Sequence, residues 1–288
     1  MKKSKLAKVL TVSLAALMVF GLASCGGGSG KVSDKDITVI SREEGSGTRD
    51  AFTELTGVLQ DDVDKTVDTA EISNSTSVVT QSVAGNDAAI GYISLGSLDD
   101  TVKAVKVDGV EATVDNIKSG DYKIQRPFNI VTKGEVKELP ADFIKFIMSK
   151  DGQKIIEDEG YISVNENAEA YKASGLKGSI TLAGSTSVSP VMEVLADKYK
   201  ELNSGVTIEI QQTGSGAGIQ STTEGVCDIG MASRELKDDE TSQGLKSEEI
   251  ALDGIAVIVN KDNGVEDLSM DQIMKIFTGE ITNWADVK

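Results

Sequence analysis

A faint internal repeat constrains this chain more than any other feature of its sequence. Five residues recur with a constant separation of 129 positions: Val136, Leu139, Asp142, Ile144 and Ile147 in the first copy, and Val265, Leu268, Asp271, Ile273 and Ile276 in the second. Each copy follows a β-branched run that ends in a lysine, at residues 129–133 and 257–261. Repetition of a strand, a polar turn and a helix predicts two similar α/β lobes.

Short β-branched runs alternate with amphipathic segments, which predicts a mostly parallel, mixed sheet flanked by helices in each lobe. Strands are expected at residues 37–40, 180–183 and 206–210. Apolar residues at helical spacing predict a helix over 188–202, in which Met192 and Tyr199 face the core rather than a ligand. Another helix is expected over 141–157, and the helix of the second repeat copy opens on a capping box that begins at Ser269.

The first 25 residues have the pattern of an export signal. Four lysines precede an apolar stretch over 9–22, which is too short for a stable membrane-spanning helix. Residues 22–25 (LASC) resemble a bacterial lipobox, and in signals of that kind the cysteine, here Cys25, is acylated. We therefore expect a lipoprotein signal peptide over 1–25, a flexible tether over 26–36, and a protein anchored by lipid on the outer face of the cytoplasmic membrane. The alternative is an ordinary secretory signal with an incidental cysteine.

Composition removes several classes of function. The 288 residues include no histidine, so the Ser-His-Asp and Cys-His catalytic arrangements and the commonest zinc ligand are excluded. The formal net charge of −17 disfavours nucleic acid and anionic lipid headgroups as partners. With two cysteines, neither a disulfide framework nor a cysteine-rich metal site is expected, and Cys227 is predicted to be a small buried core residue.

Three turns that follow predicted strands are rich in glycine, serine and threonine, at residues 44–49, 184–187 and 213–218. Helix starts offer unpaired N–H groups and partial positive charge, so turns of this kind favour a small tetrahedral oxyanion. Arg42 or Arg234 is expected to supply the matching guanidinium fork. The alternative is that Thr48, Ser187 and Ser215 only cap helices. None of the turns fits the P-loop or the Gly-x-Gly-x-x-Gly pattern, which disfavours nucleotides.

Five segments together resemble the phosphate-binding lipoproteins of bacterial phosphate ABC importers. They are residues 41–49 (SREEGSGTR), 184–190 (GSTSVSP), 214–218 (GSGAG), 228–236 (DIGMASREL) and 279–284 (GEITNW). The resemblance implies a two-lobed, type II periplasmic-binding-protein fold with a hinge, which closes on phosphate. It also implies the following phosphate contacts: Thr186, Ser187, Ser215 and Ser233 from one lobe, Arg42, Ser46, Gly47 and Thr48 from the other, and Arg234 as a second candidate cation.

Two departures from the family pattern affect these expectations. Many members have an aspartate at the position of Ser233, where it accepts the proton of hydrogen phosphate. Its absence leaves open how sulfate is rejected, and Glu43, Glu44 or Asp50 are candidate substitutes.

The second departure is the order of the motifs, which suggests a circular permutation because the block at 41–49 follows the Asn-Trp motif in most relatives. The expected lobes are then 37–126 plus 254–288, and 127–253, with hinge crossings near Pro127 and Gly254. Residues 171–178 would join what most relatives leave as free ends.

The sequence therefore predicts a monomeric phosphate receptor for an ABC importer, with permease subunits as partners and with no metal, cofactor or catalytic role. A receptor for sulfate or molybdate is the alternative within this class. A sensor or adhesin on the same fold is another, and a phosphatase is disfavoured because neither Ser46 nor Ser187 has a histidine partner.

Overall fold

The computed structural model describes residues 34–287. The expected signal peptide with Cys25, residues 26–33 of the expected tether, and Lys288 lie outside this range. Within the described range, no helix is both long enough and apolar enough to cross a membrane.

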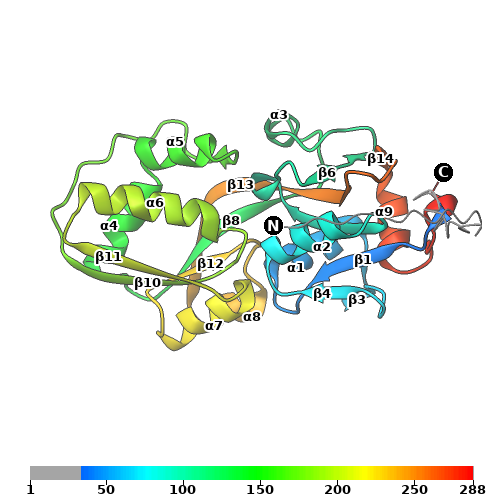
Figure 1. Cartoon of the computed structure of the whole chain (residues 1–288). Coiled ribbons are helices and arrows are strands. Elements are labelled where there is room, and N and C mark those ends of the chain that lie inside the picture. Colours follow the sequence, from blue (N-terminus) through cyan, green and yellow to red (C-terminus); the bar gives the residue numbers. More distant parts are fainter. Residues whose placement is uncertain (1–33, 288) are drawn as a thin grey trace, which may run out of the picture. The chain divides into compact units, whose positions relative to one another are not determined.

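Strands and helices alternate along the described chain (Figure 1). The first elements are β1 (Thr38–Arg42), α1 (Gly47–Thr56), β2 (Leu59–Gln60), β3 (Val63–Asp64), β4 (Glu71–Ser73), α2 (Thr76–Gly85), β5 (Ala89–Ser94), β6 (Val102–Ala104), β7 (Lys106–Val107), α3 (Val114–Lys118) and β8 (Gln125–Lys133). They are followed by α4 (Glu138–Ile147), α5 (Lys150–Asp158), β9 (Ile162–Ser163), β10 (Gly178–Gly184), α6 (Ser189–Leu202), β11 (Val206–Gln212), α7 (Ser215–Glu224), β12 (Ile229–Ala232), α8 (Asp238–Thr241), β13 (Leu245–Asn260), β14 (Asp267–Leu268) and α9 (Met270–Phe277). The expected strands at 37–40, 180–183 and 206–210 and the helix over 188–202 are thus confirmed to within two residues at each end.

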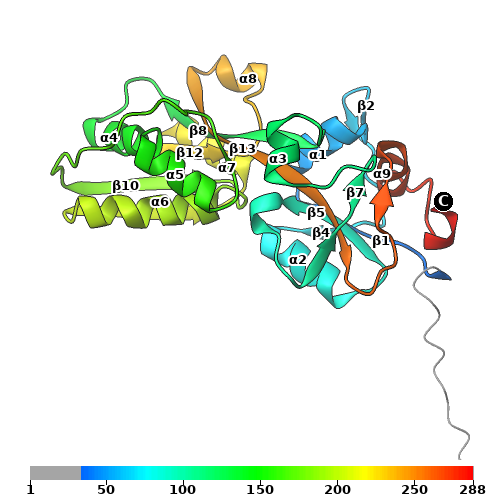
Figure 2. The same ribbon diagram turned by 90° about the horizontal axis from the view of Figure 1, so that it is seen from above.

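One sheet runs through both lobes in the order β11-β10-β12-β8-β13-β5-β1-β4. At one end β10 pairs in parallel with β11 and β12, and at the other β1 pairs in parallel with β4 and β5. Between these triplets, β8 and β13 are antiparallel to each other and to the strands beside them. The expected parallel pairing therefore holds only for the outer strands. The chain enters one lobe along β8 and returns along β13, so these strands run in opposite directions (Figure 2).

Separate cores stabilise the two lobes. In the lobe that contains β1, helices α1 and α9 pack on one face of the sheet, where Phe52 stacks on Tyr92 with ring centroids 3.9 Å apart and meets Phe277 edge-on. In the other lobe, α4, α5 and α6 cover one face and α7 the other (Figure 1). Met192 and Tyr199 are fully buried in this second core, as predicted, and Cys227 is also buried.

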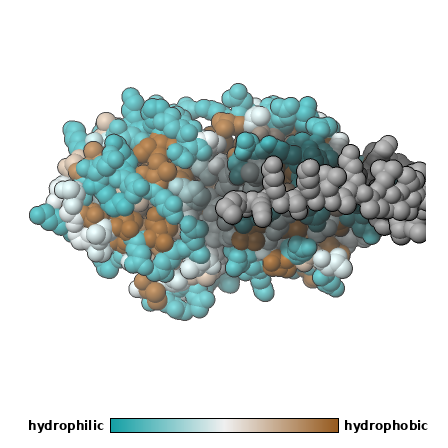
Figure 3. All heavy atoms as spheres, in the orientation of Figure 1, coloured by the Kyte–Doolittle hydropathy of each residue, from teal (hydrophilic) through white to brown (hydrophobic). Residues whose placement is uncertain are grey.

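The face of the molecule drawn in Figure 3 is mainly hydrophilic where the described residues are visible. Figure 3 shows small apolar patches on the lobe that contains α6, and two exposed apolar residues of that lobe, Val194 and Leu202, belong to this helix. Isolated exposed apolar side chains of this kind are ordinary on soluble proteins.

The segment expected as one helix over 141–157 forms two, α4 and α5. Ser149 separates them, because its hydroxyl donates to the carbonyl of Phe146 and accepts from the N–H of Gly152, which starts a new helix. A Cβ at Gly152 would lie 2.3 Å from the Phe146 carbonyl oxygen, so only glycine permits this close turn. In the second repeat copy, the capping box between Ser269 and Gln272 is present as predicted.

Candidate functional site

The three turns singled out by composition all lie at the carboxyl ends of parallel strands. They join β1 to α1, β10 to α6, and β11 to α7. Ser46 is the N-cap of α1, but the N-cap positions of α6 and α7 are Val188 and Gly214. The alternative that Thr48, Ser187 and Ser215 are helix caps is therefore wrong, and their hydroxyls are available for other contacts.

Hydroxyl groups from both lobes meet directly. Thr48 Oγ1 on α1 lies 2.9 Å from Ser187 Oγ in the turn before α6. Thr76 Oγ1 on α2 lies 3.2 Å from the same Ser187 oxygen and 3.4 Å from Thr186 Oγ1. All four side chains are buried. We call these four residues the threonine cluster.

Thr76 was not predicted from sequence. It belongs to the run SNSTS at residues 73–77, which leads from β4 into α2 and is a fourth turn rich in hydroxyl groups. That composition was the available signal, but the neighbouring strand β4 is only three residues long and does not stand out in the sequence.

A second group of hydroxyls, the serine cluster, comprises Ser185, Ser215 and Ser233. Ser185 Oγ donates to Ser233 Oγ at 3.0 Å, and Ser215 Oγ lies 3.3 Å from the same atom. The backbone N–H of Ser233 donates to Ser215 Oγ at 3.1 Å. Gly47, the first residue of α1 in the other lobe, covers this cluster, because a Cβ there would lie 2.5 Å from Ser215 Oγ and 2.8 Å from Ser233 Oγ.

Arg42 is the cation nearest the threonine cluster. Its Nη2 donates to Thr186 Oγ1 at 3.0 Å, across the lobes, and its Nη1 lies 3.5 Å from Thr76 Oγ1. Its Nε and Nη2 also hold the two carboxylate oxygens of Glu43, each at 2.8 Å. With only 2% of its surface exposed, this guanidinium is a buried, oriented fork.

A tyrosine supports the backbone beside Arg42. The N–H of Arg42 donates to the hydroxyl of Tyr92, which also bonds to Ser41 Oγ. Burial raises the pKa of Tyr92 to about 12, so this hydroxyl stays protonated and neutral at physiological pH.

Arg234 has different partners. Its Nη1 and Nη2 donate to the two carboxylate oxygens of Glu240 at 2.8 and 2.7 Å, and its Nε lies 2.9 Å from Asp50 Oδ2 on α1 of the other lobe. Burial acts to lower the pKa of Arg234, but the two carboxylates outweigh it and raise that pKa. The structure therefore places Arg234 in an ion pair between the lobes rather than beside the hydroxyl clusters.

Where β8 and β13 pair between the lobes, Arg126 and Asp253 form an ion pair of 3.1 Å, and both side chains are almost completely buried. Ser94 Oγ donates to the same carboxylate at 2.9 Å. Burial raises the pKa of Asp253 to about 6 in spite of Arg126, and it lowers the pKa of Arg126. Sequence analysis missed this pair because its members are 127 positions apart in unremarkable contexts.

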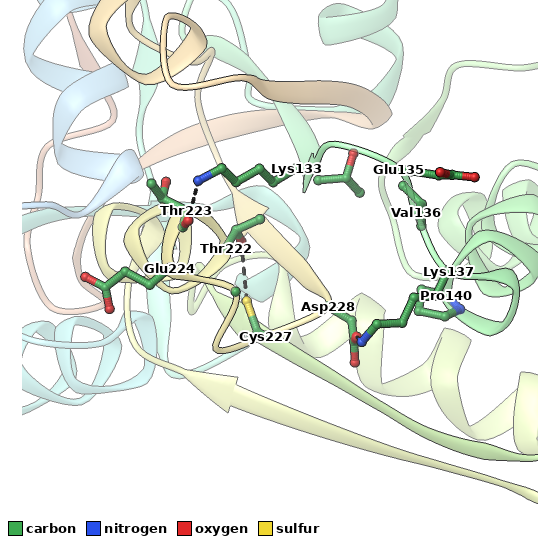
Figure 4. Close-up of a pocket in the computed structure, with 12 residues that line it drawn as sticks. Lys133, Glu135, Val136, Lys137, Pro140, Thr222, Thr223, Glu224, Cys227 and Asp228 are labelled. Atoms are coloured by element: carbon green, nitrogen blue, oxygen red, sulfur yellow. Dashed lines mark hydrogen bonds and ion pairs between the residues drawn. The ribbon is translucent and has the colours of Figure 1, made fainter.

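A pocket of about 620 Å³ that includes Thr76 and Thr186 opens beside the threonine cluster. A smaller pocket of about 320 Å³ lies on the lobe of α7, where Lys133 bonds to the carbonyl of Thr223 and Lys137 pairs with Asp228 (Figure 4). None of the site residues predicted from sequence lines this second pocket. Among residues 34–287, no group of three or more cysteine or acidic side chains could hold a metal ion.

Comparison with known proteins gives a consistent match over the whole chain. The sequence model of the PBP superfamily domain matches residues 28–151 and 169–288. A phosphate-binding protein PstS 2 of Streptococcus agalactiae is 52% identical over 100% of this chain and 99% of its own length. The PstS 2 protein of Streptococcus pneumoniae serotype 4 is 47% identical over 99% of this chain and 100% of its own.

A solved structure agrees with this match. The crystal structure of a phosphate-binding protein of a phosphate ABC transporter from Streptococcus pneumoniae superposes with a TM-score of 0.72 at 48% identity. The superposition covers 88% of this chain and 100% of the other.

Proposed function

Because the chain belongs to the PBP superfamily and, within it, to the PstS-type phosphate-binding proteins, we propose that it binds inorganic phosphate and delivers it to the permease of an ABC importer. The observation that carries this proposal is the meeting of Arg42, the threonine cluster and the serine cluster between the two lobes. These groups are buried, and except for Arg42 and its partner Glu43 they are neutral, so they bind an anion through oriented dipoles.

The ligand contacts are proposed to come from both lobes. Arg42, Ser46, Gly47 and Thr48 contribute from the lobe of β1, and Thr186, Ser187, Ser215 and Ser233 from the lobe of α6. The first residues of α1 add backbone N–H groups: Ser46 Oγ accepts from the N–H of Arg49, and the N–H groups of Gly47 and Thr48, in the same first turn, are proposed to face a ligand. Arg234 does not contact the ligand in this proposal, and instead holds the lobes together through its ion pair with Asp50.

Closure is proposed as a hinge motion between a lobe of residues 37–126 plus 254–288 and a lobe of residues 127–253. The division is supported by the two separate cores, and by the pairing of Pro127 with Leu252 and of Gln125 with Gly254 where β8 and β13 cross. A ligand that bridges both lobes favours the closed form, and docking on the permease releases it.

Export and lipid anchoring through Cys25 complete the proposal. Cys25→Ser should block acylation and lipoprotein-type cleavage, whereas Cys227→Ser should not. Mass spectrometry of the mature N-terminus distinguishes a diacylated Cys25 from an unmodified terminus further downstream, which would indicate an ordinary secreted protein.

The decisive experiment is calorimetric titration of the purified chain, freed of bound anion, with phosphate, sulfate and molybdate. Phosphate should bind most tightly. Tighter binding of sulfate or molybdate would assign the receptor to that anion, and turnover of a chromogenic phosphate ester would indicate a hydrolase. Loss of phosphate uptake on deletion of the gene separates transport from sensing.

A further inference from the structure

The proton of hydrogen phosphate needs an acceptor in a binding site, and the nearby carboxylates have other partners. Both oxygens of Glu43 are held by the fork of Arg42 at 2.8 Å. Asp50 pairs with Arg234 and with Lys237. Glu44 is exposed to solvent. The three acidic residues that the sequence offered as acceptors are thus clamped, paired or outside the buried site.

The hydrogen bonds within the serine cluster leave one hydroxyl proton and one oxygen lone pair unused. Ser185 Oγ accepts from the N–H groups of Ser187 and Val188 and gives its own proton to Ser233 Oγ. Ser215 Oγ accepts the N–H of Ser233, and one of these two hydroxyls donates to the other. A hydroxyl has one proton and two lone pairs. Whichever of the two donates, the Ser215–Ser233 pair keeps one unshared proton and one unshared lone pair.

We propose that the Ser215–Ser233 pair recognises the protonated oxygen of hydrogen phosphate, by presenting one donor and one acceptor to the ligand. This inference rests on the proposed function and names the specificity determinant of that site. The pair lies directly under Gly47 of the opposite lobe, so a ligand enclosed between the lobes meets it. Ser185 orients the pair, because its hydroxyl donates to Ser233 Oγ and so occupies one lone pair of that oxygen.

The pair also sets how strongly sulfate is rejected. Sulfate carries no proton at neutral pH, so it meets a lone pair unless the bond between Ser215 and Ser233 breaks to free a second donor. Loss of one neutral hydrogen bond corresponds to a preference for phosphate of roughly 2- to 12-fold. A carboxylate at position 233 would instead place a negative charge against sulfate and raise this preference.

The test is calorimetric titration with phosphate and with sulfate at one neutral pH, with the ratio of the two dissociation constants as the readout. Ser233→Ala frees the Ser185 proton to face the ligand, and Ser215→Ala frees the N–H of Ser233, so each variant should lower the preference for phosphate. Ser233→Asp should raise it by at least about tenfold. Ser179→Ala, in an exposed position on β10, is the matched control and should leave both affinities unchanged.

Two results would overturn the inference while the proposed function stands. One is an unchanged ratio in Ser233→Ala, Ser215→Ala and Ser233→Asp, with phosphate still bound. The other is a ratio that collapses in Glu43→Gln, which would make Glu43 the acceptor. If the unsubstituted protein binds neither anion, the proposed function itself fails. Thermal unfolding of each variant identifies any that does not fold, and the remaining variants then decide the outcome.

Discussion

The hydroxyls of Thr48 and Ser187, which are 139 positions apart in the chain, lie 2.9 Å apart across the two lobes. Both side chains are buried, so in the closed form a ligand between them replaces their mutual bond with two bonds to itself. Thr48→Val keeps the shape and removes the hydroxyl. It should weaken phosphate binding by about 1.5–3 kcal/mol, the range for a hydrogen bond to a charged group.

The control for this variant is Thr53→Val on the same helix. The Thr53 hydroxyl is also buried, but it donates to the carbonyl of Arg49 within α1. Calorimetry should show unchanged phosphate affinity in this variant, and an equal loss in both variants would mean that helix stability rather than ligand contact is being measured.

Arg42 should be the principal cation of the site. Arg42→Ala removes the fork that reaches Thr186 and leaves Glu43 without its partner. We expect a loss of about 2–5 kcal/mol of phosphate binding, as for truncation of one member of a buried charge pair. Arg42→Lys keeps the charge but not the planar geometry, so its phosphate affinity should lie between those of Arg42→Ala and the unsubstituted protein. Unchanged affinity in Arg42→Ala would refute the assignment.

The ion pair between Arg234 and Asp50 should favour the closed form. Asp50→Asn should weaken phosphate binding by up to about 1 kcal/mol at low salt, as expected for a partly exposed pair. The difference should disappear near 1 M salt, where charges are screened over about 3 Å. Asp158→Asn, which breaks the exposed pair with Lys154 inside one lobe, is the control and should have no effect. A salt-independent loss would instead point to a steric cause.

Asp253 should impose a measurable pH dependence on stability. Burial raises its pKa to about 6 in the folded protein from an ordinary value of 3.8, so between these pH values the folded chain holds a proton that the unfolded chain has lost. The contribution of this group to stability is therefore fully present below about pH 4 and declines as pH rises to about 6. Urea unfolding across this range should show that the free energy of unfolding of the original protein declines relative to that of Asp253→Asn. Parallel plots of this free energy against pH for the two proteins would contradict the prediction.

A circular permutation that restores the motif order of most relatives should leave the fold intact. The backbone N–H of Trp284 donates to the carbonyl of Lys35 at 3.0 Å, and Asp36 forms a β-bridge with Asn283, so the two ends of the described chain lie together. A chain opened near Ser174, an exposed residue, with Lys288 joined to Asp36 by a short Gly/Ser linker, should fold and bind phosphate about as tightly. Calorimetry checks this. Opening the chain inside β13 at Ile258 should abolish folding, and equal behaviour of the two would refute the argument.

Local pattern was sufficient for the strands β1, β10 and β11, for the helix that carries Met192 and Tyr199, and for the capping box at Ser269. These features depend on residues within a few positions of each other, where spacing and side-chain chemistry act directly. The break at Ser149 was also encoded locally, but a cap inside a continuous apolar pattern is hard to separate from an ordinary helical serine.

By itself, the sequence determined which turns carry hydroxyls and which arginines could serve them. Only the tertiary structure decided which of these groups meet. It placed Thr76 of α2 in the threonine cluster and paired Arg234 with Asp50 and Glu240. It also placed the guanidinium of Arg42 within hydrogen-bond distance of Thr186. The physical reason is that Thr76 and Arg42 meet Thr186, and Asp50 meets Arg234, across the two lobes and more than 100 positions apart in the chain. The distances between them are set by how the lobes pack around the shared sheet and by the pairing of β8 with β13, where local preference has no influence.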